Sequence, residues 1–363
     1  MQSLLILKKA FDTVDHEIVL QKLSCYGIHG KELLWFKSYL SNRKQQCFVN
    51  GVLSGPQGIH CGVPQGSIIG PLLFLLYIND LPGCLTHSIP NMYADDTNLT
   101  SGDFDVNNID STQINNDLDS LYGWLQANRL SLNTVKSEYM IIASRQRLAS
   151  LSREPVIKIG DCHLKRVKST KTLGVIIDET LTWNEHISHI CKKASKGLGA
   201  MRRIRDYVPA ETLKNLYLTM VLPHLDYCAP VWDTCGKGLR ERVQRIQNRA
   251  GRIITRSGYE IRSNDVLHSL SWDNLETRRF KQKVTTMYKI INCEMPEYLC
   301  NIFQNVSDIH DYDLRGCHSN LRLPQPKTNF LKNSFLYSGA AAWNSLPLTS
   351  RESPSLCSFK KVL

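Results

Sequence analysis

The spacing of apolar residues in the first half of the chain predicts an alternation of strands and helices. An apolar run around Leu4 predicts a strand, and residues 46–52, which alternate and turn at Asn50-Gly51, predict a hairpin. Residues 67–81 are apolar over a helical length, which predicts a buried helix. Residues 91–100 predict a second hairpin with two adjacent acids at its turn.

This mixture continues to about residue 186. Within residues 117–130, Leu118, Leu121 and Leu125 share one face, which predicts an amphipathic helix. Residues 172–178 are mainly apolar and predict a further strand. Because strands and helices are interspersed in this way, we expect an α+β domain.

Beyond residue 186 the pattern becomes helical and basic. Residues 186–205 and 238–256 each carry an apolar stripe at helical spacing, with their cationic residues off that stripe. A solvated helix face explains either segment alone, whereas two in succession favour contact with nucleic acid. The cationic residues are Lys192, Lys193, Lys196, Arg202, Arg203 and Arg205 in the first segment, and Arg240, Arg242, Arg245, Arg249, Arg252 and Arg256 in the second.

Composition favours a folded, basic protein. The chain has 363 residues, 42% of them hydrophobic and 21% charged, which suits two or three subdomains. Its 44 Lys and Arg exceed its 33 Asp and Glu, and the net charge of +11 favours nucleic acid or an anionic membrane face as partner. No apolar run is long enough for a spanning helix, so we expect no membrane insertion. The twelve cysteines form no Cys-x-x-Cys pair and no signal peptide is evident, which predicts a reduced, intracellular protein in the nucleus or cytoplasm.

The most informative segment is Tyr93-Ala94-Asp95-Asp96, which follows Val63-Pro64-Gln65-Gly66 along the chain. Two adjacent carboxylates in an otherwise apolar turn are costly to desolvate unless a cation holds them. Magnesium prefers oxygen ligands, and it is the metal that usually accompanies nucleotide phosphates. The paired acids therefore predict a magnesium site for chemistry on nucleotides.

Together these two segments resemble the palm of a reverse transcriptase, and the surrounding residues are similar to the non-LTR (LINE-type, jockey/CR1-like) retrotransposon branch. The resemblance implies an RNA-directed DNA polymerase that uses two Mg²⁺ ions, deoxynucleotides, an RNA template and a DNA primer. It leaves the oligomeric state open. The resemblance extends through residues 8–16, 70–74 and 77–81, and into the second half through Tyr217, residues 223–228, Val231-Trp232, residues 247–250 and residues 343–347.

The resemblance implies roles for particular residues. Asp95 and Asp96 would ligate metal and act in catalysis, and Lys136 corresponds to the residue thought to protonate pyrophosphate. Phe11, Gln65 and Gly66 would lie at the incoming nucleotide. Phe11 corresponds to the aromatic gate that excludes a 2′ hydroxyl, although core packing explains a phenylalanine here equally well.

Further roles concern the primer and the template. The turn at Leu173, Gly174 and Val175 resembles the primer grip, where a small residue admits the primer backbone. Arg43 and Gln46 align with a segment that faces the template. In domain terms, the resemblance implies an α+β palm of mixed helix and antiparallel sheet over residues 1–186. A basic helical thumb over residues 187–260 and a C-terminal region of unknown role over residues 261–363 would follow.

One position departs from the family pattern. Aligned on Phe11, the first catalytic Asp of the family falls at position 6, where this chain has Ile6. Isoleucine cannot ligate a metal ion, so we predict little or no polymerase activity. The family's finger motifs and endonuclease are absent, which predicts an amino-terminally truncated domain. A noncatalytic nucleic-acid-binding remnant and a decayed open reading frame are the alternatives.

The prediction has one spatial requirement. If the resemblance to a polymerase palm is correct, Asp95 and Asp96 must face the strand that contains Ile6.

Overall fold

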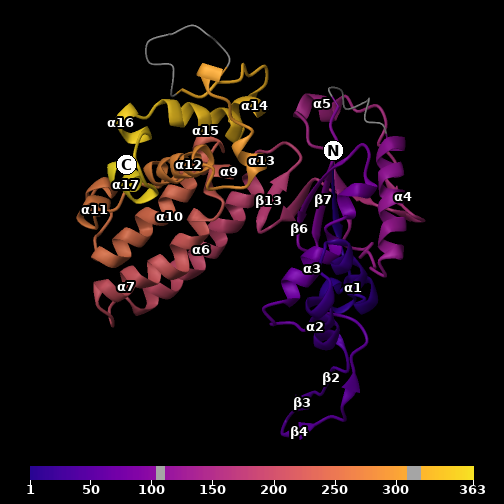
Figure 1. The fold of residues 1–363 in the computed structure, drawn as a ribbon. Helices are drawn as coiled ribbons and strands as arrows, with labels where there is room; N and C mark the ends of the chain where they lie inside the picture. The colour runs from indigo at the N-terminus through magenta and orange to yellow at the C-terminus, as the bar shows by residue number, and fades with distance from the viewer. Residues whose placement is uncertain (104–110, 309–319) are drawn as a thin grey trace. The chain divides into compact units, whose positions relative to one another are not determined.

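The computed structural model describes residues 1–103, 111–308 and 320–363, and they form two compact units, Met1–Thr170 and Lys171–Leu363 (Figure 1). Both units contain strands and helices, as an α+β fold requires. Within the described ranges, no helix combines the length and the apolarity needed to cross a membrane.

The first unit is built on a five-stranded sheet with β1 (Gln2–Ile6) at its centre. β1 pairs antiparallel with β7 (Asp96–Thr100) on one side and β8 (Glu138–Met140) on the other. β6 (Ile89–Tyr93) pairs antiparallel with β7, and β11 (Lys165–Arg166) runs parallel to β8. The strand expected around Leu4 and the hairpin expected over residues 91–100 are both confirmed.

Helices share one hydrophobic core with this sheet. They are η1 (Ala10–Asp12), α1 (His16–Cys25), α2 (Gly30–Leu40), α3 (Gly70–Ile78), η2 (Leu81–Cys84), α4 (Ser111–Ala127) and α5 (Arg145–Ala149). Leu5 and Leu99 point from neighbouring strands into the same core as Leu73, Phe74 and Leu118 of the helices. The amphipathic helix expected over residues 117–130 is present as α4, which begins earlier.

The buried helix expected over residues 67–81 is present as α3, with one of its faces exposed. α3 is shorter than that stretch, and Leu72 and Leu75 are 53% and 50% exposed. The helix buries one face, which includes Leu73 and Phe74, and it packs against α1 and η1. Because almost every residue in the segment is apolar, its pattern could not distinguish a half-buried helix from a buried one.

Two short ladders form a hairpin arm that extends away from α1, α2 and α3 (Figure 1). β2 (Lys44–Gln45) pairs with β5 (Gln57–Gly58), and β3 (Phe48–Val49) pairs with β4 (Val52–Leu53). Asn50 and Gly51 have φ of 52° and 81°, the two left-handed residues that a tight hairpin turn needs. The hairpin expected here is confirmed. A further small hairpin joins β9 (Lys158–Ile159) to β10 (Cys162–His163).

The second unit opens with a hairpin, where the sequence pattern predicted one continuous strand over residues 172–178. β12 (Ser169–Thr172) and β13 (Val175–Asp178) are adjacent strands of a two-stranded sheet. Leu173 and Gly174 between them have φ of 46° and 86°. Two consecutive left-handed residues reverse the chain, and an apolar run alone does not reveal them.

Helices make up the rest of the second unit. α6 (Asn184–Ile204) and α10 (Lys237–Thr255) pack along each other and confirm the two basic helices expected from the sequence. Trp232 and Trp343 are 0% and 3% exposed, so both are core residues. The remaining elements are α7 (Ala210–Leu216), the π-turn η4 (Tyr217–Val221), α8 (Leu222–Asp226), α9 (Ala229–Trp232), α11 (Ser263–Ser269), α12 (Leu275–Ile291), α13 (Glu297–Cys300), η5 (Val306–Asp308), α14 (Asn329–Asn333), α15 (Phe335–Asn344), α16 (Leu348–Arg351) and α17 (Leu356–Val362).

Candidate active site

The paired acids lie at the turn of the β6–β7 hairpin. Tyr93 and Asp96 form the last cross-strand pair, so Ala94 and Asp95 make a two-residue turn. Ala94 has φ of 49°, which gives the turn its left-handed position. Asp95 and Asp96 are both half-buried.

Ile6, the last residue of β1, lies directly opposite Asp96 in the antiparallel ladder. Side chains of directly opposed residues project from the same face of a sheet, with Cβ atoms about 4.5–5.5 Å apart. A carboxylate at position 6 would therefore stand beside that of Asp96. The structure meets the spatial requirement stated from the sequence for Asp96, and it puts an aliphatic side chain where the family's first catalytic acid would be.

The electrostatics of Asp96 follow from its surroundings. Burial raises the pKa of the Asp96 carboxyl above its ordinary value, and the neighbouring Asp95 charge raises the same pKa further. Among the residues that the structure describes, no cationic group offsets either effect, so within them the acidic turn carries unneutralised negative charge. Such a turn attracts cations.

Lys136 belongs to a turn that is hydrogen-bonded to the backbone of Ile6. The backbone N–H of Asn133 donates to the carbonyl oxygen of Ile6 at 2.8 Å, and the N–H of Ile6 donates to Ser137 Oγ at 3.4 Å. Lys136 lies between Asn133 and Ser137, and its side chain is exposed. Because β7 is on one side of β1 and this turn is on the other, Lys136 and the two acids flank the same end of β1.

The nucleotide-site candidates form a second group. Phe11 in η1 is half-buried, and its ring packs against that of Phe74 in a tilted arrangement with centroids 4.5 Å apart. The N–H of Val63 donates to the carbonyl oxygen of Phe11 at 2.9 Å, and Gln65 Nε2 donates to Asp12 Oδ1 at 2.8 Å. The structure thus brings Phe11 together with the segment that contains Gln65 and Gly66.

Gly62 makes this approach possible. It has φ of +86°, and a Cβ atom built on it would lie 2.7 Å from the carbonyl oxygen of Asp12. Its N–H donates to the carbonyl oxygen of Val14 at 2.7 Å. Sequence reasoning passed over Gly62 and Asp12 as site residues, although a glycine before Val-Pro-Gln-Gly is a signal for close backbone contact.

The template and primer candidates lie elsewhere. Arg43 and Gln46 are exposed on the hairpin arm, where Arg43 stacks over Tyr39 and Gln46 Nε2 donates to the carbonyl oxygen of Ser54 at 2.8 Å. Leu173 and Gly174 form the turn between β12 and β13, and Val175 begins β13. There the Tyr227 hydroxyl donates to the carbonyl oxygen of Leu173 at 2.6 Å.

The donor set does not fit the two-ion site that the resemblance implies. Such a site needs carboxylates from separate strands, since one turn cannot surround two ions. Asp95 and Asp96 come from one turn, and Ile6 supplies no ligand from β1. Among the residues that the structure describes, no group of three or more His, Cys, Asp or Glu could hold one metal ion.

Comparison with known proteins identifies the domain that carries this arrangement. Residues 3–177 match the family model described as reverse transcriptase (RNA-dependent DNA polymerase). Residues 3–177 are a reverse transcriptase domain. The match begins in β1 and ends in β13, so it contains the paired acids, the position of Ile6 and every residue to which the sequence resemblance assigned a role.

Relatives of the reverse transcriptase domain come from non-LTR elements of Drosophila melanogaster. The chain is 25% identical to the probable RNA-directed DNA polymerase from transposon BS, over 78% of the chain and 33% of that protein. It is 26% identical to the probable RNA-directed DNA polymerase from transposon X-element, over 72% of the chain and 29% of that protein. It is 24% identical to the RNA-directed DNA polymerase from mobile element jockey, over 73% of the chain and 29% of that protein. The chain thus spans about a third of the length of these relatives.

Proposed function

We propose that this chain binds an RNA template and a DNA primer as a retrotransposon reverse transcriptase domain but supports little or no DNA synthesis. The family match over residues 3–177 and the polymerase names of the relatives support the nucleic-acid ligands. The net charge of +11 agrees with a polyanionic partner. Deoxynucleotides are the corresponding small-molecule substrate.

The observation that carries the proposal is the pairing of Ile6 with Asp96. Phosphoryl transfer depends on charge stabilisation by groups held in place before the reaction. Loss of one such group costs roughly 3–4 kcal/mol, a factor of about 10² to 10³ in rate. We therefore expect this domain to polymerise far more slowly than a relative with aspartate at position 6.

The finer assignments belong to the same proposal. Residues 1–186 would act as the palm, residues 187–260 as the thumb, and residues 261–363 as a further region of unknown role. Asp95, Asp96 and Lys136 would flank the primer end, and Phe11, Gln65 and Gly66 would contact the incoming nucleotide. Their grouping around β1 and η1 supports these roles.

The primer and template roles complete the proposal. The β12–β13 turn at Leu173, Gly174 and Val175 would grip the primer, and its left-handed glycine supports this role because a small residue admits a close backbone. Arg43 and Gln46 would face the template, which their exposure on the hairpin arm supports.

Primer extension on poly(rA)–oligo(dT) with magnesium tests the proposal. The unmodified chain should extend the primer no faster than Asp95→Asn/Asp96→Asn, and Ile6→Asp should extend it measurably faster. Robust extension by the unmodified chain, abolished in Asp95→Asn/Asp96→Asn, would refute the proposed inactivity. Absence of template–primer binding in the unmodified chain would refute the proposed ligands.

A further inference from the structure

A pair of cysteines flanks the turn that joins α12 to α13. Cys293 lies two residues beyond Ile291, where α12 ends, and Cys300 is the last residue of α13. Both are free thiols, and Cys293 is exposed whereas Cys300 is half-buried. The side chains of the two cysteines share a hydrogen bond, so their sulfur atoms are in direct contact.

The backbone of the turn accounts for the position of Cys293. The N–H of Cys293 donates to the carbonyl oxygen of Ile290 at 3.1 Å, and the N–H of Glu294 donates to that of Lys289 at 2.8 Å. Together with φ of 53° at Cys293, these two bonds form a Schellman motif, which ends α12 and reverses the chain. Glycine is the usual residue at this left-handed position, so a cysteine here is an unfavourable choice for the turn alone.

Cys300 is held against the same turn from the other side. Its Sγ atom donates to the carbonyl oxygen of Met295 at 3.3 Å, and its N–H donates to the carbonyl oxygen of Pro296 at 3.3 Å. Met295 and Leu299 pack against the hydrophobic core that α12 shares with α15 and α17. The contact between the thiols is therefore held in place by a hydrogen-bonded backbone and by core packing.

The two thiols differ in their access to solvent. Cys293 is the more exposed of the pair, so a dissolved reagent reaches it first. Desolvation and then the contact with Cys293 raise the pKa of the Cys300 thiol, which keeps this thiol protonated at neutral pH. An exposed thiol with a second thiol beside it is the arrangement in which one cysteine reacts and its neighbour resolves the product.

We propose that Cys293 and Cys300 are a redox modification site, at which a small-molecule disulfide of the glutathione class converts the pair into a disulfide between α12 and α13. The Cys293 thiolate attacks one sulfur of the small molecule, whose S–S bond breaks and whose other half leaves as a thiol. The Cys300 thiol then loses its proton and attacks Sγ of Cys293, which releases the second half as a thiol. The two cysteines are oxidised, and the two small thiols carry away both electrons and both protons.

The reaction requires little rearrangement of the fold. Sulfur atoms that are already in contact have only to approach each other to about 2.0 Å. Small thiols reverse both steps, so the disulfide is transient in a reducing compartment. The proposal stands on residues of the second unit alone and does not depend on the chemistry proposed for Asp95 and Asp96.

Disulfide mapping by mass spectrometry tests the proposal. The full chain is treated with oxidised glutathione, the remaining thiols are blocked with iodoacetamide, and the protein is digested with trypsin. Cleavage after Lys289 and Arg315 leaves both cysteines on one peptide, which should be lighter by two hydrogens and carry no blocking group. A second digestion after Glu294 and Glu297 should give fragments that stay joined until a reductant is added.

Variants separate the two steps. Cys300→Ser should retain glutathione on Cys293 as a mixed disulfide, because no second thiol displaces it. Cys357→Ser is the matched control, since it removes another exposed cysteine of the same unit, and it should form the disulfide like the unmodified chain. In urea, where the folded contact is lost, the unmodified chain should form the disulfide at least about tenfold more slowly.

Two results would overturn the proposal. One is a mixed disulfide on Cys293 of the unmodified chain that never resolves, because Cys300 would then be out of reach. The other is an equal rate of disulfide formation in the folded and the urea-unfolded chain, because the turn would then contribute nothing. Should Cys300→Ser fail to fold, Cys293→Gly suits the left-handed position, removes the thiol that reacts first, and should leave Cys300 reduced under the same treatment.

Discussion

Substitution of Gly62 by alanine tests how closely the segment that contains Gly62, Gln65 and Gly66 packs against η1. Gly62 has φ of +86°, and an added Cβ would lie 2.7 Å from the carbonyl oxygen of Asp12 and 2.9 Å from its carbonyl carbon and Cα. These are backbone atoms, so they cannot rotate out of the way as a side-chain tip can. The hydrogen bonds from Gly62 to Val14 and from Val63 to Phe11 would have to lengthen.

The expected cost has two parts. A left-handed backbone costs an alanine about 1–2 kcal/mol. Overpacking against a fixed neighbour adds about 1–3 kcal/mol, so Gly62→Ala should lose roughly 2–5 kcal/mol of unfolding free energy. Gly66 is the matched control, because its φ is +79° but nothing lies within 4 Å of its Cβ position. Gly66→Ala should lose only the first part.

The assay must report on the first unit by itself. Hydrogen exchange of peptides from residues 1–103, followed by mass spectrometry across a urea titration, gives the unfolding free energy of that unit. Gly62→Ala should be destabilised by at least about 1 kcal/mol more than Gly66→Ala. Equal losses in the two variants would refute the close approach of Gly62 to Asp12.

Two further predictions concern buried charge. The Asp233 carboxylate accepts hydrogen bonds from Lys283 at 2.6 Å and from Arg279 at 2.8 Å, so Asp233→Asn leaves two buried cations without their anion. The variant should lose about 3–5 kcal/mol of unfolding free energy in a urea titration. Asp206→Asn, which removes the acid of an exposed pair, should lose less than about 1 kcal/mol. Burial alone would raise the pKa of Asp233, but Lys283 and Arg279 outweigh it and lower that pKa. The stabilisation by the Asp233 charge is therefore complete above the pKa of the unfolded state, about 3.9, and disappears as the pH falls through the pKa of the folded state. In acid, the unfolding free energy of Asp233→Asn should therefore fall less steeply than that of the unmodified chain. Conversely, the raised pKa of Asp96 means that its charged form opposes folding. Asp96→Asn should therefore raise the melting temperature at neutral pH, and this gain should disappear in acid. An unchanged melting temperature at neutral pH would contradict this prediction.

The sequence was sufficient to predict the β6–β7 hairpin and the opposition of Ile6 and Asp96. Local turn residues and a strong motif determine both features, and the ladder confirms the register. The exposure of Leu72 and Leu75 could not be predicted, because an all-apolar helix has no polar face to show which side meets solvent. The apolar pattern alone ran one strand through the Leu173-Gly174 turn, because left-handed φ leaves little trace in hydropathy, whereas the family resemblance placed a turn there.

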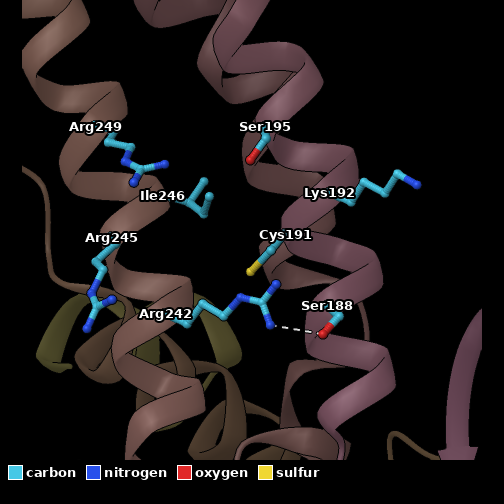
Figure 2. Close-up of a pocket in the computed structure, with 8 residues that line it drawn as sticks. All are labelled: Ser188, Cys191, Lys192, Ser195, Arg242, Arg245, Ile246 and Arg249. Carbon is cyan, nitrogen blue, oxygen red and sulfur yellow. Dashed lines mark hydrogen bonds between the residues drawn. The ribbon is translucent and has the colours of Figure 1, made fainter.

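The basic helices show the same division. The off-stripe cations of α6 and α10 were evident from helical spacing, as was the possibility of a nucleic-acid contact. The packing of α6 along α10, across which Arg242 donates to Ser188 (Figure 2), was not, because it depends on how two helices distant in sequence meet.

The central claim is that an aliphatic residue at position 6 leaves the carboxylate set of this domain incomplete. A titration with Mn²⁺ followed by electron paramagnetic resonance tests it without relying on turnover. Ile6→Asp should bind Mn²⁺ at least about tenfold more tightly than the unmodified chain, about 1.4 kcal/mol, and Ile6→Asp/Asp96→Asn should lose that gain. Equal Mn²⁺ affinity in the unmodified chain and in Ile6→Asp would contradict the account.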